Sequence, residues 1–201
     1  MRNTVLILII LLFSCNLSNK TAKQFFKNGE EKFDKEKYEL AIKLYNKAIN
    51  LSPKFKLAYL KRASSKYMLS NYKGAKTDLD KVIDLDSVNI NAYFNRGDTK
   101  IRLQNYTEAI ADFNKIINLD SKHMQAFCFR GIAKDRLKDH RGAILDYTKA
   151  IEINPKYADA FFHRGVTKYM IGRMDGACSD LNKALELGCV DAKEAIEKIC
   201  L

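Results

Sequence analysis

The stretch from Tyr93 to Ile116, YFNRGDTKIRLQNYTEAIADFNKI, decides the fold. Its first half places Tyr93, Gly97 and Lys100 at positions i, i+4 and i+7. Its second half repeats that spacing at residues 109, 113 and 116. This period is typical of an amphipathic helix. The polar residues 104–107 interrupt it, so the stretch predicts two helices joined by a short turn.

The same pattern recurs every 34 residues, which marks an internal repeat. The aromatic positions are Phe25, Tyr59, Tyr93, Phe127 and Phe161, the small positions are Gly29, Ala63, Gly97, Gly131 and Gly165, and the alanine positions are Ala41, Ala75, Ala109, Ala143 and Ala177. Small residues are expected where the two helices of a pair cross, because a larger side chain would push their axes apart. We therefore predict five helix pairs over 22–55, 56–89, 90–123, 124–157 and 158–191, followed by a capping helix over 192–201.

The repeats resemble the tetratricopeptide repeat (TPR) family. The aromatic, Gly, Ala, aromatic, Ala and Pro positions of that family appear in the first repeat as Phe25, Gly29, Ala41, Tyr45, Ala48 and Pro53, and in the fourth as Phe127, Gly131, Ala143, Tyr147, Ala150 and Pro155. Repeats two and three carry Ser where the family expects Pro. The resemblance covers about 170 residues and implies an all-α, right-handed solenoid of five helix pairs plus a C-terminal capping helix.

Two charged series follow the repeat. The arginines are Arg62, Arg96, Arg130 and Arg164, and the aspartates, each sixteen residues later, are Asp78, Asp112, Asp146 and Asp180. The first repeat has Asn28 and Leu44 at these positions and lacks both charges. This joint absence predicts that each Arg pairs with its Asp between helices and sets the stacking register.

The N-terminus reads MRNTVLILIILLFSC, a positive residue followed by a short apolar run, which is typical of a signal peptide. Its end, LFSC, resembles the lipobox of bacterial lipoproteins, although Phe13 is bulkier than that pattern usually carries. The resemblance implies a signal peptide over 1–14, a palmitate-type lipid anchor on Cys15 and a tether to residue 21. An ordinary signal peptide and an uncleaved anchor are the alternatives. Asn16 favours the outer membrane of the bacterial cell envelope over the inner one.

Four cysteines remain after Cys15, and an oxidising envelope permits disulfides. Cys178 and Cys200 fall in the last two expected helices, so this pair is the candidate disulfide. Cys189 is the rival partner, and Cys128 is expected to be free. The alternative is that all four are small buried apolar residues.

The TPR resemblance implies that the first helices of the repeats line a concave groove that holds a peptide or a helix. The candidate groove residues are Phe26, Lys61, Phe94, Asn95, Asp98, Arg102, Phe129, Phe162 and His163. Aromatic side chains among charges of both signs suit protein recognition. The alternative for the aromatic ones is packing between repeats. We expect an unidentified envelope protein as the partner.

Residues 96–98 spell Arg-Gly-Asp, the tripeptide that adhesion receptors recognise. Arg96 and Gly97 belong to repeat series, so we interpret the match as a repeat signature within a helix. No catalytic, metal-binding or cofactor-binding pattern occurs, and we expect no enzyme activity, cofactor or small-molecule substrate. The net charge of +11 admits a nucleic-acid binder as an alternative, which the export signal disfavours. An accessory lipoprotein that assists secretin or β-barrel assembly is a further alternative.

Overall fold

The computed structural model describes residues 19–200, and these residues form helices and turns with no strand. The predicted all-α class is thereby confirmed. Cys15, Asn16 and the predicted signal peptide lie outside the described residues. The chain divides into two compact units, the first ending at Ala92 and the second beginning at Tyr93, within the first turn of one helix.

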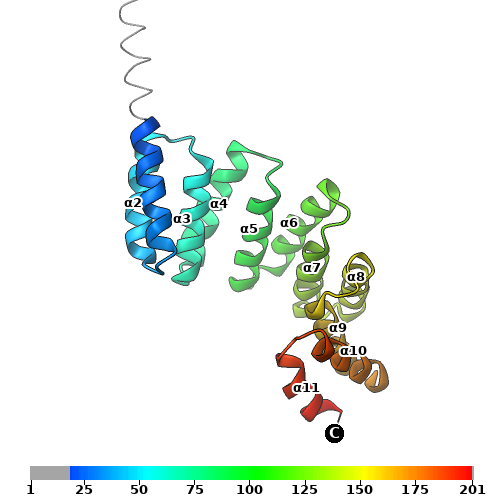
Figure 1. Cartoon of the computed structure of the whole chain (residues 1–201). Coiled ribbons are helices and arrows are strands. Elements are labelled where there is room, and N and C mark those ends of the chain that lie inside the picture. The colour runs from blue at the N-terminus through cyan, green and yellow to red at the C-terminus, as the bar shows by residue number, and fades with distance from the viewer. Residues whose placement is uncertain (1–18, 201) are drawn as a thin grey trace, which may run out of the picture. The chain divides into compact units, whose positions relative to one another are not determined.

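The first unit contains the helical segment 19–33, drawn in dark blue in Figure 1, and three further helices. These are α2 (Tyr38–Leu51), α3 (Lys56–Met68) and α4 (Tyr72–Leu85). The predicted tether was placed up to residue 21, but residues 19–21 are already helical. Ala22 is buried, so the packed face of this segment begins at its first described turn.

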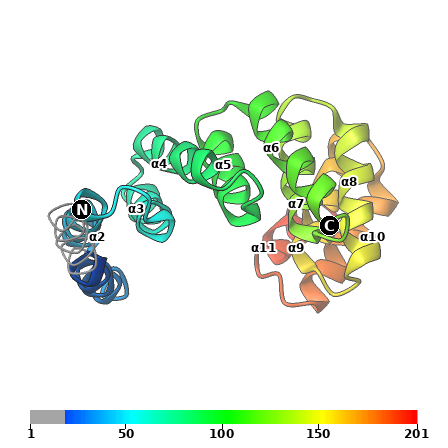
Figure 2. The ribbon, with the colours of Figure 1, turned by 90° about the horizontal axis from the view of Figure 1, so that it is seen from above.

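The second unit contains most of α5 and six further helices, which Figures 1 and 2 show as neighbouring pairs. They are α5 (Ile90–Arg102), α6 (Tyr106–Leu119), α7 (Met124–Arg136), α8 (His140–Ile153), α9 (Ala158–Met170), α10 (Met174–Glu186) and α11 (Asp191–Ile199). The last helix begins slightly before residue 192 and ends slightly before residue 201, which are the bounds of the predicted range.

The two helices of a repeat approach closely at the predicted small residues. A Cβ atom added at Gly97 would lie 2.7 Å from Cζ of Phe113, and one added at Gly131 would lie 2.7 Å from Cε1 of Tyr147. Such separations are well inside van der Waals contact, so glycine is required beside these rings. The second repeat has Ala63 packed with the smaller Leu79 in one cluster. Small and large residues therefore compensate one another across the crossing.

Each first helix ends in the same main-chain turn. One residue per repeat has a left-handed backbone, with φ of 56° at Glu36, 57° at Ser70, 61° at Gln104, 65° at Lys138 and 78° at Gly172. The next residue donates its N–H to a carbonyl five positions earlier, as Asn71 does to Lys66 and Asp139 does to Lys134. This is the Schellman arrangement that closes a helix end. Only the fifth repeat uses glycine there.

Candidate functional site

Four repeats contain an Arg–Asp–Lys triad around a buried aspartate. In the fourth repeat, Nε and Nη2 of Arg130 donate to the two carboxylate oxygens of Asp146 at 2.9 and 2.6 Å, and Nζ of Lys134 lies 2.8 Å from Oδ2. The four triads are Arg62–Asp78–Lys66, Arg96–Asp112–Lys100, Arg130–Asp146–Lys134 and Arg164–Asp180–Lys168. The aspartates expose only 3% to 5% of their surface, so each needs both cations to offset its desolvation.

Arg62, Arg130 and Arg164 also reach the repeat before their own. Nη1 of Arg62 donates to Asn46 at 2.6 Å, and the Nη1 atoms of Arg130 and Arg164 donate to Asn114 and Thr148 at 2.7 and 3.0 Å. Each guanidinium also stacks over the aromatic ring three residues earlier, for example Arg130 over Phe127 at 5.3 Å. One arginine thus ties three helices together. The arrangement is that of a structural clamp, because all three guanidinium nitrogens of Arg62, Arg130 and Arg164 donate to groups within the protein.

The structure joins Cys178 of α10 to Cys200, the residue that follows α11, with their Cα atoms 5.7 Å apart. Cys128 and Cys189 are free thiols. Burial raises the pKa of Cys128 to about 12, so this thiol stays protonated at neutral pH. Burial also raises the pKa of Cys189. The disulfide fixes the far end of α11, which is the wall of the pocket described below.

In the first unit, the candidate groove residues Phe26 and Lys61 contact other groups of that unit. The ring of Phe26 lies 4.9 Å from that of Phe55 and 5.7 Å from that of Tyr45, so this side chain packs between helices. Nζ of Lys61 lies 3.7 Å from Glu30 and 5.6 Å from the ring centroid of Phe33. Only Lys61 keeps a polar group at the surface here.

The candidates on α5 and α7 divide in the same way. Phe94 and Phe129 meet edge-on with ring centroids 4.9 Å apart, and both contact Phe113. They therefore serve packing between repeats. Asp98 is half-buried and lies 4.0 Å from the exposed Arg102 one turn later. Asn95, also half-buried, accepts a hydrogen bond at its backbone carbonyl from Thr99.

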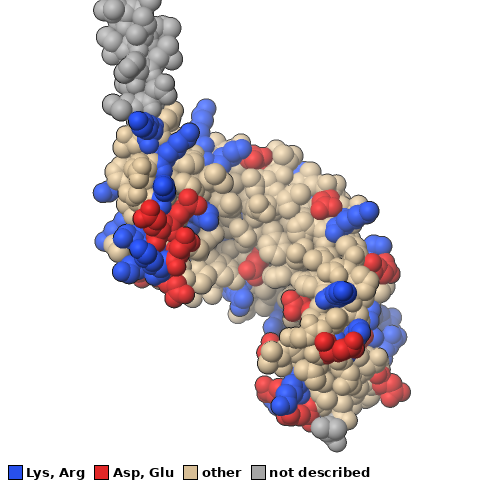
Figure 3. All heavy atoms as spheres, in the orientation of Figure 1, with Lys and Arg blue, Asp and Glu red and all other residues tan. Residues whose placement is uncertain are grey.

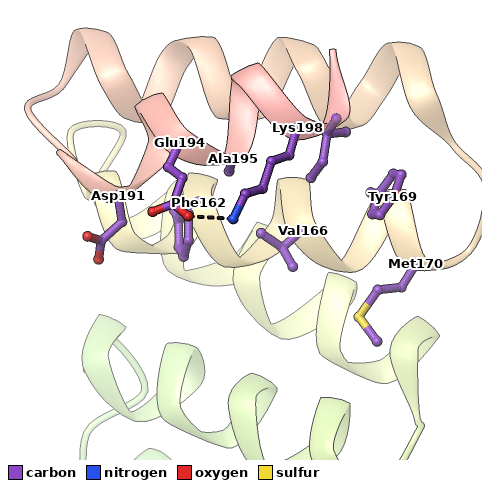
Figure 4. Close-up of a pocket in the computed structure, with 9 residues that line it drawn as sticks. Phe162, Val166, Tyr169, Met170, Asp191, Glu194, Ala195 and Lys198 are labelled. Carbon is purple, nitrogen blue, oxygen red and sulfur yellow. Dashed lines mark hydrogen bonds and ion pairs between the residues drawn. The ribbon is translucent and has the colours of Figure 1, made fainter. Parts of the chain in front are cut away.

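The remaining candidates, Phe162 and His163 on α9, border two pockets. The pocket shown in Figure 4 lies between α9 and α11 and has a volume of about 530 Å³. Its lining residues are Phe162, Val166, Tyr169, Met170, Asp191, Glu194, Ala195, Lys198 and Ile199. Figure 4 shows the Glu194–Lys198 ion pair of α11 beside Phe162, with Val166 farther along α9.

A second pocket of about 490 Å³ lies on the other side of Phe162, Val166 and Met170, between α7, α8 and α9. Its other lining residues are Ile132, Asp135, Arg136, Lys138, His140, Tyr147 and His163. Asp135 is engaged by His140 at 2.8 Å and by the hydroxyl of Thr167 at 3.1 Å. The three shared residues form an apolar ridge, which we call the α9 ridge, with one pocket on each side and charged groups at the rims.

His163 lies at the base of the α9 ridge. Its ring stacks on Tyr147 at 5.8 Å and meets Phe162 edge-on at 5.3 Å. Burial lowers the pKa of His163, and the nearby Asp159 and Asp135 oppose that effect only in part. The imidazole is therefore neutral at physiological pH and acts as a flat, weakly polar part of the pocket wall.

Comparison with known families agrees with this architecture. A family model described as TPR repeat matches residues 29–70 and 136–172, and one described as tetratricopeptide repeat matches residues 90–123. The chain is built from tetratricopeptide repeats. A search of curated protein sequences finds no match.

Solved structures similar to this TPR chain share its fold. MamA is 27% identical, with a TM-score of 0.73 over 82% of this chain and 96% of its own. YrrB, described as a TPR protein with an unusual peptide-binding site, is 20% identical, with a TM-score of 0.69 over 86% of this chain and 90% of its own. PilW, described as a widely conserved type IV pilus biogenesis factor, is 20% identical, with a TM-score of 0.76 over 84% of this chain and 78% of its own.

The TPR pattern did not lead us to the lysines of the triads. Lysine occupies this position in all five repeats, including Lys32 of the first, which has no aspartate sixteen residues after Asn28. Because this lysine is present in every repeat, its presence does not vary with that of the Arg–Asp pair, which the first repeat lacks. A signal was nevertheless present, because a lysine four residues after the arginine lies on the same helix face.

Among residues 19–200, no group of three or more His, Cys, Asp or Glu side chains is placed to hold a metal ion. In the same part of the chain, no helix is both long and apolar enough to cross a bilayer. The chemistry that the α9 ridge offers is contact with apolar side chains, together with hydrogen bonds and ion pairs at its rims.

Proposed function

We propose that this TPR chain is a non-catalytic adaptor that holds a peptide or helix of a protein partner against the α9 ridge. The observation that carries the proposal is the pair of pockets on either side of Phe162, Val166 and Met170. Met170 is 56% exposed and Tyr169 is 43% exposed, so both offer apolar contact area to a ligand. Exposed apolar area rimmed by polar groups is the usual character of a protein-binding surface.

The pockets fit apolar anchor side chains of a peptide better than a small polar metabolite. Each has a volume in the range of ligand sites, and each is open along the ridge. The rim next to α7 carries Arg136 and Lys138, whereas Asp191 lies at the start of α11. A segment with two apolar anchors and charges at both ends would complement this surface. The peptide-binding site described for YrrB supports the idea only at the level of the fold.

We further propose that the adaptor is a lipoprotein of the bacterial cell envelope. The apolar run ends in the LFSC sequence, and its Leu12, Ser14 and Cys15 support a diacylglyceryl anchor on Cys15. Two or more acyl chains suffice for stable membrane attachment. Asn16 favours the outer membrane. The partner is then an envelope protein that the adaptor holds near the bilayer.

An alternative within this function is an accessory lipoprotein for envelope assembly, of the secretin or β-barrel type. The structural likeness to PilW, a pilus biogenesis factor, favours it at the level of the fold. It differs from the adaptor proposal only in the identity of the partner. Nucleic-acid binding has weaker support, namely the net charge of +11, and would show as salt-dependent retention on DNA.

Site-specific cross-linking in cells tests the adaptor proposal. A photoreactive phenylalanine analogue at Met170 is expected to form one dominant protein adduct. The same analogue at Leu145, which is 71% exposed on α8 and lies outside both ridge pockets, is the control. The adduct should disappear with Val166→Glu and persist with Leu145→Glu. Equal adducts at both positions, or adducts that Val166→Glu leaves unchanged, would contradict the proposed binding surface.

The anchor is tested separately by metabolic labelling with a palmitate analogue. The full chain should take up the label, and Cys15→Ser should not. Label that persists in Cys15→Ser, or its absence from the wild-type chain, would refute lipid attachment at Cys15 and leave the α9 ridge proposal intact.

A further inference from the structure

The positive charge of the chain is concentrated in the first unit. Residues 19–92 contain 16 Lys or Arg and 9 Asp or Glu, whereas residues 93–200 contain 18 Lys or Arg and 15 Asp or Glu. Within the first unit, the 38 residues 40–77 contain nine basic residues and no acidic one. The excess of basic over acidic residues is therefore seven in the shorter unit and three in the longer one. The uneven distribution needs a local explanation.

Part of this excess lies along one edge of the unit. Lys20, Lys23 and Lys27 follow one another at helical spacing on the segment 19–33, and all three are exposed. Exposed Lys47, near the end of α2, and exposed Lys54, in the turn after it, lie at the same edge. We call these five residues the basic edge.

Packing shows that the elements of the basic edge meet there. A core cluster joins Ala48 and Ile49 of α2 and Ala58 of α3 to Phe25 on the segment 19–33 and to Phe55 in the turn. Nζ of Lys47 lies 5.2 Å above the ring of Phe25, which brings α2 next to the lysines of the first segment. The basic edge is thus a continuous surface over one core cluster.

The carboxylates of the first repeat lie at the opposite end. Glu30, Glu31 and Asp34 come in and after the last turn of the segment 19–33, and Glu36 and Glu39 lie in or near the first turn of α2. None of Lys20, Lys23 and Lys27 is ion-paired with a carboxylate within the described residues. Figure 3 shows blue side chains at the N-terminal end of this unit and a red group below them. The two ends of the first repeat therefore differ in sign.

We propose that the basic edge docks on an anionic phospholipid bilayer. This inference rests on the proposed lipid anchor, since four residue steps separate Cys15 from Asn19 and span at most about 14 Å. An anchored chain would hold Lys20 and Lys23 close to the headgroups, where the potential of an anionic surface decays over about 8 to 10 Å. The lipid attaches the chain, and the basic edge orients the first repeat on the membrane.

The test is vesicle binding by the chain that begins at Asn16. This chain keeps every described residue, and the core clusters that hold the helices together lie within residues 19–200. The probes are vesicles of phosphatidylcholine alone and vesicles that are half phosphatidylglycerol. We expect binding only to the anionic vesicles, and we expect it to weaken as salt is added.

The decisive variant is Lys20→Gln/Lys23→Gln/Lys27→Gln. It should weaken binding about a hundred-fold, because a lysine near an anionic surface contributes about a five-fold factor in affinity. The matched control is Lys35→Gln/Lys37→Gln/Lys73→Gln, which removes the same charge from exposed residues at the opposite end of the first unit. The control should keep most of the binding.

Equal losses in the two triple variants would overturn the proposal, because they would show attraction by net charge alone. Absence of vesicle binding together with retention on duplex DNA would also overturn it and favour a nucleic acid instead. Because this chain carries no lipid, failure here is distinguishable from failure of the Cys15 labelling experiment.

Discussion

At the scale of single residues, the Arg–Asp–Lys triads show how a repeat is held in register. Each aspartate is buried between two cations, and Arg62, Arg130 and Arg164 also bond to the preceding repeat. The pairing of Arg with Asp could be predicted because the first repeat lacks both. The participation of Lys could not be predicted in this way, because Lys32 is present even in the first repeat. Comparison among repeats therefore finds only those partners that vary together.

The triads predict a strong coupling between Arg130 and Asp146. Asp146→Leu alone should cost about 3–5 kcal/mol of unfolding free energy, because it leaves two half-buried cations without their shared carboxylate. Arg130→Asn/Asp146→Leu reproduces the residues of the first repeat and should cost less than Asp146→Leu alone. Chemical denaturation of Arg130→Asn, Asp146→Leu, the double variant and the wild type measures the coupling energy of the pair. Additive costs would contradict the proposed clamp.

A second residue-scale prediction concerns pH. Burial lowers the pKa of His163, so the unfolded chain binds a proton more readily than the folded one. The stabilisation is complete above the unfolded pKa of about 6.5 and is lost as the pH falls toward the folded value. His163→Phe keeps the stacking on Tyr147 and should make the melting temperature less sensitive between about pH 7.5 and 5. An unchanged pH dependence would show that other groups cause the loss.

At the scale of elements, α11 depends on its neighbours. It has nine residues, too few for a stable isolated helix, and Ala192 is its one buried residue among the described positions. The disulfide between Cys178 and Cys200 anchors its C-terminal end to α10. The pocket between α9 and α11 could not be predicted from the sequence, because its size depends on how closely the small Ala195 lets the two helices approach. The charged pair that borders it, Glu194 and Lys198, is exposed.

Reduction of this disulfide should loosen α11. A cross-link that closes a loop of this length contributes about 3 kcal/mol. We expect hydrogen exchange to accelerate in residues 191–199 of Cys200→Ser, with little change in α7. Binding of a partner to the α9 ridge should also weaken, because its pocket loses one wall. Unchanged exchange in α11 would mean that packing alone holds this helix.

At the scale of the whole molecule, the 34-residue period was sufficient to predict the helix pairs, their crossing residues and their turns. Those features are local to a repeat, so five copies of the pattern reinforce one another. The α9 ridge and the basic edge were not predicted as surfaces. Both depend on side chains that differ between repeats, and a period carries no information about such positions. Phe94 and Phe129 illustrate the ambiguity, since groove and packing positions share the same residue types.

The modular architecture predicts that damage stays local. Gly131→Ala would bring a methyl group against Tyr147 and should cost about 1–3 kcal/mol. Hydrogen exchange should rise in α7 and α8 and change little in α2 and α3, because each repeat contacts mainly its neighbours. Tyr147→Leu should recover part of the loss, since Ala and Leu occupy these positions in the second repeat. A uniform rise across both units would instead indicate one cooperative fold.

The left-handed turn that ends each first helix bears on how such a chain evolves. Glu, Ser, Gln, Lys and Gly all occupy the left-handed position, so main-chain hydrogen bonds within the repeat set the turn whatever the side chain. A duplicated segment of 34 residues would carry its own complete helix stop and would not need new mutations to fold. Gain or loss of whole repeats is therefore an accessible route for this lineage, and partner specificity can then diverge in each copy without disturbing the turns.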